Sequence, residues 1–208
     1  MDLDWRDDRF LSTCTTEKSI YIYDIFANET EPVQVLSGHH QDEINSVKWS
    51  PDGSLLASCS DDKTACIWSF SEQEGASKEP IVLRGHEKEI YCLKWCPTGP
   101  GSSNPDSPAV LATASFDQTV RLWDPHTGAC LHVLRRHTDS VYAIGFSPDG
   151  HFLASGSLDE SINIWSVDDG QLVRTYDSGR GGIFELAWNP TGDRLATCTS
   201  DSTVYQNF

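Results

Sequence analysis

Short apolar runs separated by turn-forming residues fill the sequence, and this pattern predicts strands rather than helices. Four of the runs end in an aromatic residue, at Trp49, Trp95, Phe146 and Trp188. A turn of the Pro-Asp-Gly kind follows three of them, at residues 51–53, 148–150 and 190–192. Because Pro presets φ and Gly readily adopts a positive φ, we expect each turn to be a tight connection between antiparallel strands.

A second pattern recurs in register with the first, namely a hydroxyl residue, then an Asp at a turn, then a strand ending in Trp. Copies lie at residues 58–68, 113–124, 155–165 and 197–205, and a degenerate copy lies at 13–24. The Trp position recurs after 45 residues from Tyr23 to Trp68, after 55 at Trp123 and after 42 at Trp165. A turn-rich insertion at residues 99–108 accounts for the longest spacing and predicts a loop, with a contact role as one interpretation.

These anchors, with the dipeptides Gly38-His39, Gly85-His86 and Arg136-His137 upstream, resemble WD repeats. The resemblance implies an all-β fold, a WD-repeat β-propeller with four-stranded antiparallel blades. We predict one propeller segment over residues 1–208, incomplete with about four or five repeats. The predicted repeats span residues 1–24, 33–68, 81–124, 131–165 and 172–208. Closure into a five-blade ring is the alternative.

A narrower resemblance is carried by the runs at residues 95–101, 114–124 and 178–189, which are similar to the transducin beta-like co-repressor subunits. That family has an N-terminal helical domain and more blades than this chain, so we expect a fragment or a shorter form. The resemblance implies a scaffold of a histone-deacetylase co-repressor complex. The implied partners are co-repressor proteins and histone deacetylase, histone tails or other basic peptides, transcription factors, and the ubiquitin machinery.

In WD repeats a His, a Ser or Thr, the turn Asp and the Trp form one hydrogen-bonded chain, and the resemblance assigns matching sets here. Buried donors and acceptors of these types can satisfy one another, and one left unpaired costs about 1–3 kcal/mol. Since the set recurs, it favours a structural role over a catalytic triad. The predicted sets are His39, Ser58, Asp62 and Trp68, then His86, Thr113, Asp117 and Trp123, and then His137, Ser155, Asp159 and Trp165.

Propellers commonly bind partners at the end of the ring where the inner strands begin, and two positions per repeat project there. Large side chains at these positions predict a peptide-binding hot spot, with packing of the channel mouth as the alternative. Acidic residues beside them suit a Lys or Arg of a peptide. The predicted binding residues are Glu43, Asn45, Asp61, Glu89, Tyr91, Phe116, Tyr142, Leu158 and Phe184.

The formal net charge of −16 argues against direct binding of nucleic acid, which requires a cationic surface. No secretory signal and no run long enough to cross a membrane occurs, so we expect a soluble intracellular chain without a membrane partner. The seven cysteines are scattered, and we interpret them as reduced core thiols. Cys92 and Cys96 have no second pair at zinc-finger spacing, so we predict no metal and no cofactor.

The sequence therefore predicts a non-enzymatic adaptor that binds peptides and proteins. Its location would be the nucleus, with the cytoplasm as a second compartment. The alternative function is that of a substrate receptor of a cullin-type ubiquitin ligase, which rests only on the WD-repeat class. An enzyme has little support, because no nucleophile on a strained turn and no phosphate-binding loop occurs.

Overall fold

The computed structural model describes residues 2–27, 30–99, 102, 104–202 and 204–207. The two ends of the predicted segment, residues 1 and 208, lie outside the described residues, as do positions 100, 101 and 103 of the insertion and 203 of the last repeat. The described residues form β-strands and no helix. None of them forms a helix long and apolar enough to span a membrane.

The strands form five antiparallel sheets, numbered here in chain order. Sheet 1 contains β1 (Leu3–Trp5), β2 (Phe10–Cys14), β3 (Ile20–Asp24) and β4 (Gln34–Leu36). Sheet 2 contains β5 (Ile44–Trp49), β6 (Leu55–Ser60), β7 (Thr64–Ser71) and β9 (Ile81–Arg84), and the short β8 (Gly75–Ala76) pairs with the end of β7.

The remaining three sheets repeat the same antiparallel order. Sheet 3 contains β10 (Ile90–Trp95), β11 (Leu111–Ser115), β12 (Thr119–Trp123) and β13 (Cys130–Arg135). Sheet 4 contains β14 (Val141–Phe146), β15 (Phe152–Ser157), β16 (Ser161–Ser166) and β17 (Leu172–Asp177). Sheet 5 has three described strands, β18 (Ile183–Trp188), β19 (Leu195–Thr199) and β20 (Val204–Asn207).

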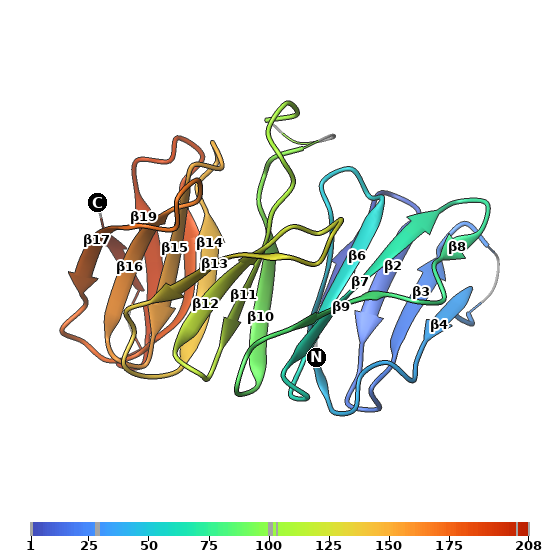
Figure 1. Cartoon of the computed structure of the whole chain (residues 1–208), viewed down its shortest axis with the longest axis horizontal. Helices are drawn as coiled ribbons and strands as arrows, with labels where there is room; N and C mark the ends of the chain where they lie inside the picture. The colour runs from blue at the N-terminus through green and yellow to red at the C-terminus, as the bar shows by residue number, and fades with distance from the viewer. Residues whose placement is uncertain (1, 28–29, 100–101, 103, 203, 208) are drawn as a thin grey trace.

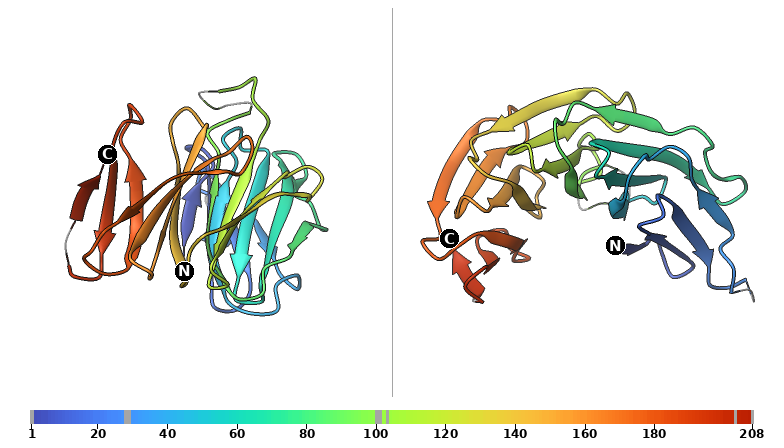
Figure 2. Two further views of the ribbon diagram at one scale, coloured as in Figure 1. Left: turned by 60° about the vertical axis from the view of Figure 1, so that its left-hand side comes forward. Right: turned by 90° about the horizontal axis from the view of Figure 1, so that it is seen from below.

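The five sheets stand side by side in an arc whose concave side carries the first strand of each sheet (Figure 1 and Figure 2, right). The predicted all-β, WD-repeat architecture of an incomplete propeller is confirmed. The described residues leave the arc open in Figure 2, so they do not form the closed five-blade ring that was the alternative.

In sheets 1 to 4 the outer strand is supplied by the segment that precedes the next sheet. For example, β4 pairs with β3 of sheet 1, and the chain then continues directly into sheet 2. One sequence repeat therefore spans two sheets and ties each to its neighbour.

The hydrophobic core consists of layers between neighbouring sheets. Phe10, Trp49 and Phe70 pack between sheets 1 and 2, with ring centroids 5.0–5.2 Å apart. Glycine allows the closest approach between sheets 4 and 5, because a Cβ on Gly156 would lie 2.8 Å from the Ile183 Cβ. Each buried aliphatic side chain contributes about 1.5–3 kcal/mol, so these layers hold the arc together.

The cysteines only partly match the sequence interpretation. Cys14, Cys59, Cys66 and Cys96 are buried, Cys92 is half-buried, and all seven are free thiols. Cys130 and Cys198 are exposed, so the prediction of core thiols is wrong for these two. Cys130 is the first residue of the outer strand β13, in which only Leu134 is buried, and sequence hydrophobicity alone did not reveal that.

Candidate functional site

A β-bulge at the start of the inner strand shapes the candidate binding surface. In each of sheets 2 to 5 the pairing between the first and second strands shifts by one residue. A bulged residue has no partner across the ladder, and the local bend re-aims its side chain. The residues skipped by the pairing are Asn45, Tyr91, Tyr142 and Phe184, which are the first set of predicted binding positions.

Backbone hydrogen bonds bring the second set of predicted positions to the same end of the arc. The N–H of Asp61 donates to the Glu43 carbonyl, and the N–H of Phe116 donates to the Glu89 carbonyl, both at 3.0 Å. In sheet 4 the N–H of Leu158 donates to the Ser140 carbonyl at 3.0 Å. The end of the second strand is thereby fixed beside the start of the first, and we call this end of the arc the rim.

Four of the predicted residues form one aromatic group, which we call the rim cluster: Tyr91, Phe116, Tyr142 and Phe184. Tyr142 is central, with ring centroids 4.8 Å from Tyr91, 5.0 Å from Phe116 and 5.3 Å from Phe184. Tyr91 also stacks on Phe116 at 5.7 Å. The cluster is packed internally and still open to solvent, since Tyr91 is 41% and Phe184 is 45% exposed.

The predicted residues of sheets 2 and 4 extend the rim differently. Asn45 donates its amide to Asp61 Oδ1 at 2.6 Å and to the Ile90 carbonyl at 3.0 Å, so sheet 2 presents a polar pair where sheet 3 presents aromatic rings. Leu158 is half-buried and lies against the Gly182 backbone, where a Cβ would be 2.6 Å from its Cδ2. The rim is therefore polar at sheet 2 and apolar from sheet 3 to sheet 5.

A polar hollow of about 350 Å³ lies on the concave side of the arc beside the rim cluster. The sequence patterns did not identify the charged side chains that line it, which are Asp2, directly before β1, and Lys48, Lys94 and Glu185 of the inner strands. Lys48 Nζ lies 2.8 Å from Asp2 Oδ2. Burial raises the pKa of Asp2, but hydrogen bonds from Lys48 and Ser46 outweigh burial and lower it, so this carboxylate is charged at neutral pH. The alternation along the inner strands could have identified these positions.

In sheet 3 the structure brings together all four predicted network residues. His86 Nδ1 lies 2.8 Å from Asp117 Oδ2, and His86 Nε2 lies 2.8 Å from Thr113 Oγ1. The Trp123 indole N–H donates to the same hydroxyl at 2.8 Å. In sheet 4, His137, Ser155, Asp159 and Trp165 make the same contacts at 2.7–3.2 Å.

In sheet 2 the predicted histidine is wrong, because His40 and not His39 makes the contacts. His40 Nδ1 lies 2.9 Å from Asp62 Oδ2, and His40 Nε2 lies 2.7 Å from Ser58 Oγ. His39 is half-buried outside this network. His86 lies four residues before Ile90, where β10 begins, and counting back four residues from Ile44 selects His40.

The fourth predicted member in sheet 2, Trp68, also departs from the expectation. Its ring packs 6.2 Å from His40, but among the described residues its indole nitrogen has no hydrogen-bond partner. Sheet 2 therefore has the His, Ser and Asp part of the network without the indole bond.

The three network carboxylates are held in the charged form. Burial raises the pKa of Asp117, but hydrogen bonds from His86 and Thr119 outweigh it, and the pKa lies well below its usual range. Asp62 and Asp159 follow the same pattern. The hydroxyls of Ser58, Thr113 and Ser155 belong to residues with 0% exposure, so no substrate reaches them. The geometry stabilises the sheets and offers no nucleophile to solvent.

The described residues do not meet the requirements of a metal site. Within the described residues, no group of three or more His, Cys, Asp or Glu side chains could hold a metal ion. Burial raises the pKa of Cys92 to about 12, which keeps this thiol protonated and makes it a poor ligand or nucleophile at neutral pH.

Comparison with known proteins identifies the class of this chain. The family model described as "WD domain, G-beta repeat" matches residues 30–69, 77–124, 128–166 and 170–206, and the chain belongs to this family. The WD40 repeat-containing protein HOS15 of Arabidopsis thaliana is 48% identical over 153 residues, covering 74% of this chain and 24% of that protein.

Two further relatives have a similar percentage identity to this chain. The F-box-like/WD repeat-containing proteins TBL1X of Mus musculus and TBL1Y of Homo sapiens are each 46% identical over 152 residues, covering 73% of this chain and 28% of the relative. The predicted resemblance to the transducin beta-like family is therefore confirmed. The chain spans about a quarter of the length of the curated relatives it matches. The WD-repeat family is one of scaffolds, and the match indicates no enzyme class.

Proposed function

We propose that this chain is the propeller part of a transducin beta-like adaptor and that its rim binds a basic peptide segment of a partner protein. The observation that carries the proposal is the rim cluster, in which Tyr142 contacts the other three aromatic rings and Tyr91 and Phe184 remain exposed to solvent. Exposed aromatic clusters of this kind are typical of binding hot spots.

Charge supports a basic partner rather than an acidic one. The chain carries 31 Asp and Glu against 15 Lys and Arg. At the rim itself, Glu43 directly precedes β5 of sheet 2, the Asp61 side chain of the polar pair follows β6, and Glu89 directly precedes β10 of sheet 3. A cationic side chain next to an apolar one would find both a carboxylate and an aromatic face here.

The assembly we propose is a nuclear co-repressor complex with a histone deacetylase, in which histone tails and transcription factors supply the bound segments. The similarity to HOS15, TBL1X and TBL1Y supports this placement. The ubiquitin machinery is a further proposed partner. The competing assignment is a substrate receptor of a cullin-type ligase.

One affinity purification from nuclear extract tests both the surface and the assembly. The baits are the 208-residue chain, a Tyr91→Ala/Tyr142→Ala/Phe184→Ala variant, and a Phe26→Ala control, whose exposed ring lies outside the rim. We expect the chain and the control to recover a deacetylase, co-repressor subunits and histones, and the rim variant to lose roughly tenfold or more of them.

Thermal unfolding of the three baits separates loss of binding from loss of fold. Equal recovery of partners by the rim variant would show that the rim does not bind them. Recovery of ligase adaptors without a deacetylase would replace the co-repressor assignment with the ligase receptor.

A further inference from the structure

The outer grooves between neighbouring sheets, at the end of the arc opposite the rim, are not all filled in the same way. The described residues of the insertion, 99, 102 and 104–108, lie at this end, in the green part of the ribbon at the top of Figure 1. In the groove between sheets 1 and 2, the side chain of Arg6 occupies the space beside Gly53. Its Nε donates to the Gly53 carbonyl at 2.9 Å, and its guanidinium carbon lies 5.0 Å from the centroid of the Phe70 ring.

Carboxylates complete the Arg6 site. Arg6 Nη1 lies 2.9 Å from Asp7 Oδ2 and 3.2 Å from Glu72 Oε1. The guanidinium group is thus held by one backbone carbonyl, an aromatic face and two acidic side chains. This combination is the usual environment of a partly buried arginine in proteins.

Strand register identifies the corresponding positions between sheets 3 and 4. Arg6 directly follows Trp5, which pairs with Leu11, and Cys96 directly follows Trp95, which pairs with Leu111. On the facing sheet, Gly150 corresponds to Gly53, because each precedes by three residues the Leu that pairs with the sheet's buried Trp. A short thiol therefore stands where the first groove has an arginine.

Gly150 faces Cys96 as Gly53 faces Arg6. A Cβ on Gly150 would lie 3.2 Å from Cys96 Sγ, and a Cβ on Gly53 would lie 2.8 Å from Arg6 Nε. The Gly150 carbonyl accepts a hydrogen bond from the Cys96 thiol at 3.5 Å, and a carbonyl oxygen has a second lone pair for a further donor. The acceptor that corresponds to the one used by Arg6 is thus present in the groove between sheets 3 and 4.

The shorter side chain leaves a cavity of about 290 Å³ between sheets 3 and 4. Its apolar lining includes Val110, Leu131 and Val167, and the insertion contributes Ser107 and Pro108. This volume lies at the lower limit of the roughly 300–1,000 Å³ typical of small-molecule sites, so one long side chain fits it better than a whole ligand.

Acidic groups surround the cavity. Burial raises the pKa of Asp149, but the hydrogen bond from Ser147 outweighs it and lowers the pKa, so this carboxylate is charged at neutral pH. Asp168 also lines the cavity, and its side chain is 84% exposed. Two imidazoles share the lining, with His132 Nε2 3.2 Å from the Asp168 carbonyl and His151 Nδ1 4.0 Å from Asp168 Oδ2.

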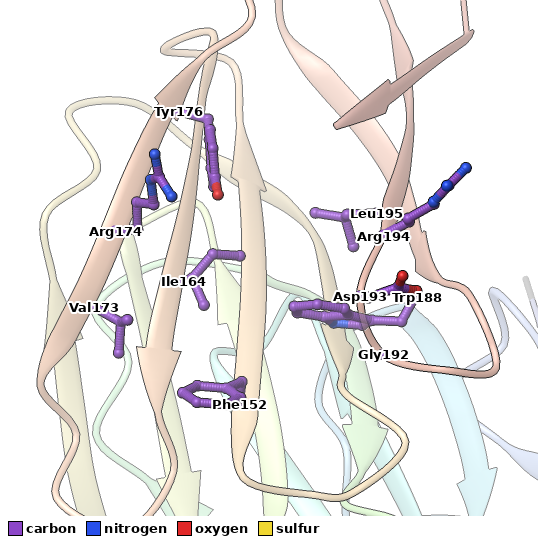
Figure 3. A pocket seen from close by; sticks show the side chains of 10 residues that line it. All are labelled: Phe152, Ile164, Val173, Arg174, Tyr176, Trp188, Gly192, Asp193, Arg194 and Leu195. Carbon is purple, nitrogen blue, oxygen red and sulfur yellow. The ribbon is translucent and has the colours of Figure 1, made fainter. Parts of the chain in front are cut away.

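The groove between sheets 4 and 5 differs from the groove between sheets 3 and 4 in the charge of its lining. Figure 3 shows Phe152, Ile164 and Trp188 around a cavity of about 280 Å³. Arg174 and Arg194 line this cavity together with Asp193. Two guanidinium groups against one carboxylate disfavour a further cation there, whereas the groove between sheets 3 and 4 carries carboxylates.

We propose that the cavity between sheets 3 and 4 is a docking site for an arginine side chain of a partner protein. The aliphatic stem would pack on Val110, Leu131 and Val167, and the guanidinium would donate to the Gly150 carbonyl and to the carboxylates of Asp149 and Asp168. This site does not depend on the rim, and it gives Ser107 and Pro108 of the insertion a role in one wall of a binding pocket.

An amide NMR titration of the isotope-labelled 208-residue chain tests the proposal. The probes are the blocked tripeptide acetyl-Gly-Arg-Gly-amide and matched tripeptides with Lys or norleucine at the centre. We expect the Arg peptide to give saturable shifts at Gly150, Val167 and Leu131. The Lys and norleucine peptides should bind at least roughly fivefold more weakly than the Arg peptide, because neither has the planar guanidinium group with its several N–H donors.

Variants assign the contacts. Asp168→Asn should weaken binding of the Arg peptide roughly twofold to fivefold, as for an exposed charge pair, and the exposed Glu79→Gln control should leave binding unchanged. Cys96→Arg should fill the cavity from within and abolish the shifts. If that variant does not fold, the effect of Asp168→Asn on binding of the Arg peptide still tests the proposal. The proposal would be overturned if the norleucine peptide caused the same shifts as the Arg peptide, or if Asp168→Asn left binding of the Arg peptide unchanged.

Discussion

Sheets 3 and 5 carry the same inner-strand bulge and the same kind of turn after the second strand, where Gln118 and Ser202 have a positive φ, but they differ in the network beneath the rim. In sheet 3, Thr113 is bonded by both His86 and Trp123 at 2.8 Å. In sheet 5, Gly179 occupies the register position of the histidine, and the buried Thr197 hydroxyl has no partner among the described residues. Sheet 5 nevertheless places Phe184 in the rim cluster, so the rim does not require the network.

The comparison separates residues that stabilise a sheet from residues that form a surface. The network residues of sheet 3 are buried, whereas the bulge residues project from the ladder in sheets with and without the network. Substitutions in the network should therefore change the free energy of unfolding. Substitutions in the rim cluster should mainly change binding.

Removing the imidazole from sheet 3 should have the largest effect on stability. His86→Ala leaves the Thr113 hydroxyl and the Asp117 carboxylate without their buried partner and creates a cavity. We expect a loss of about 3 kcal/mol in the free energy of unfolding, measured by urea denaturation with tryptophan fluorescence. His126→Ala, at an exposed turn position, should change it by less than about 0.5 kcal/mol. Equal effects would show that His86 is not a structural anchor.

The same substitution should have opposite effects in the two sheets. Thr113→Val removes the acceptor of Trp123 and the partner of His86, and should cost about 2 kcal/mol. Thr197→Val removes a buried hydroxyl that has no partner among the described residues, and should be neutral or stabilise the protein by up to about 1 kcal/mol. Urea titration of both variants measures the difference. A loss at Thr197 as large as that at Thr113 would mean that its hydroxyl has a partner.

The repeats, the strand order and the rim residues were predictable from the sequence, because they depend on local patterns. Turn residues, alternation and the aromatic ends of strands recur in register whatever the neighbours are. The adjacent residues His39 and His40 could not be distinguished by residue type, and only the distance to the start of β5 separates them. The cavity beside Cys96 was not predictable, because it depends on a difference in side-chain length. Cys96, between sheets 3 and 4, is shorter than Arg6, which occupies the corresponding position between sheets 1 and 2.

The pairing of His86 with Asp117 also predicts the smallest effect, a fall in stability between neutral and mildly acidic pH. Burial lowers the pKa of His86 below its usual value of 6.5, and the hydrogen bond to Asp117 opposes this only in part. The unfolded histidine therefore binds a proton at a pH at which the folded one does not. The contribution of His86 to stability must fall as pH falls below about 6.5, and from pH 7 to 5.5 the loss from this group is at most about 1.3 kcal/mol.

The carboxylate has a separate pH window. Because the folded pKa of Asp117 is lowered, the stability it contributes is present above its usual pKa of 3.8 and is lost only as pH falls below that value. Urea denaturation at pH 7 and 5.5 therefore excludes the contribution of Asp117, and a variant assigns the remaining change to His86. His86→Gln should reduce the pH dependence relative to the parent chain, and His39→Gln, outside the network, should retain it. A parent chain that becomes more stable as pH falls through this range would contradict the predicted direction.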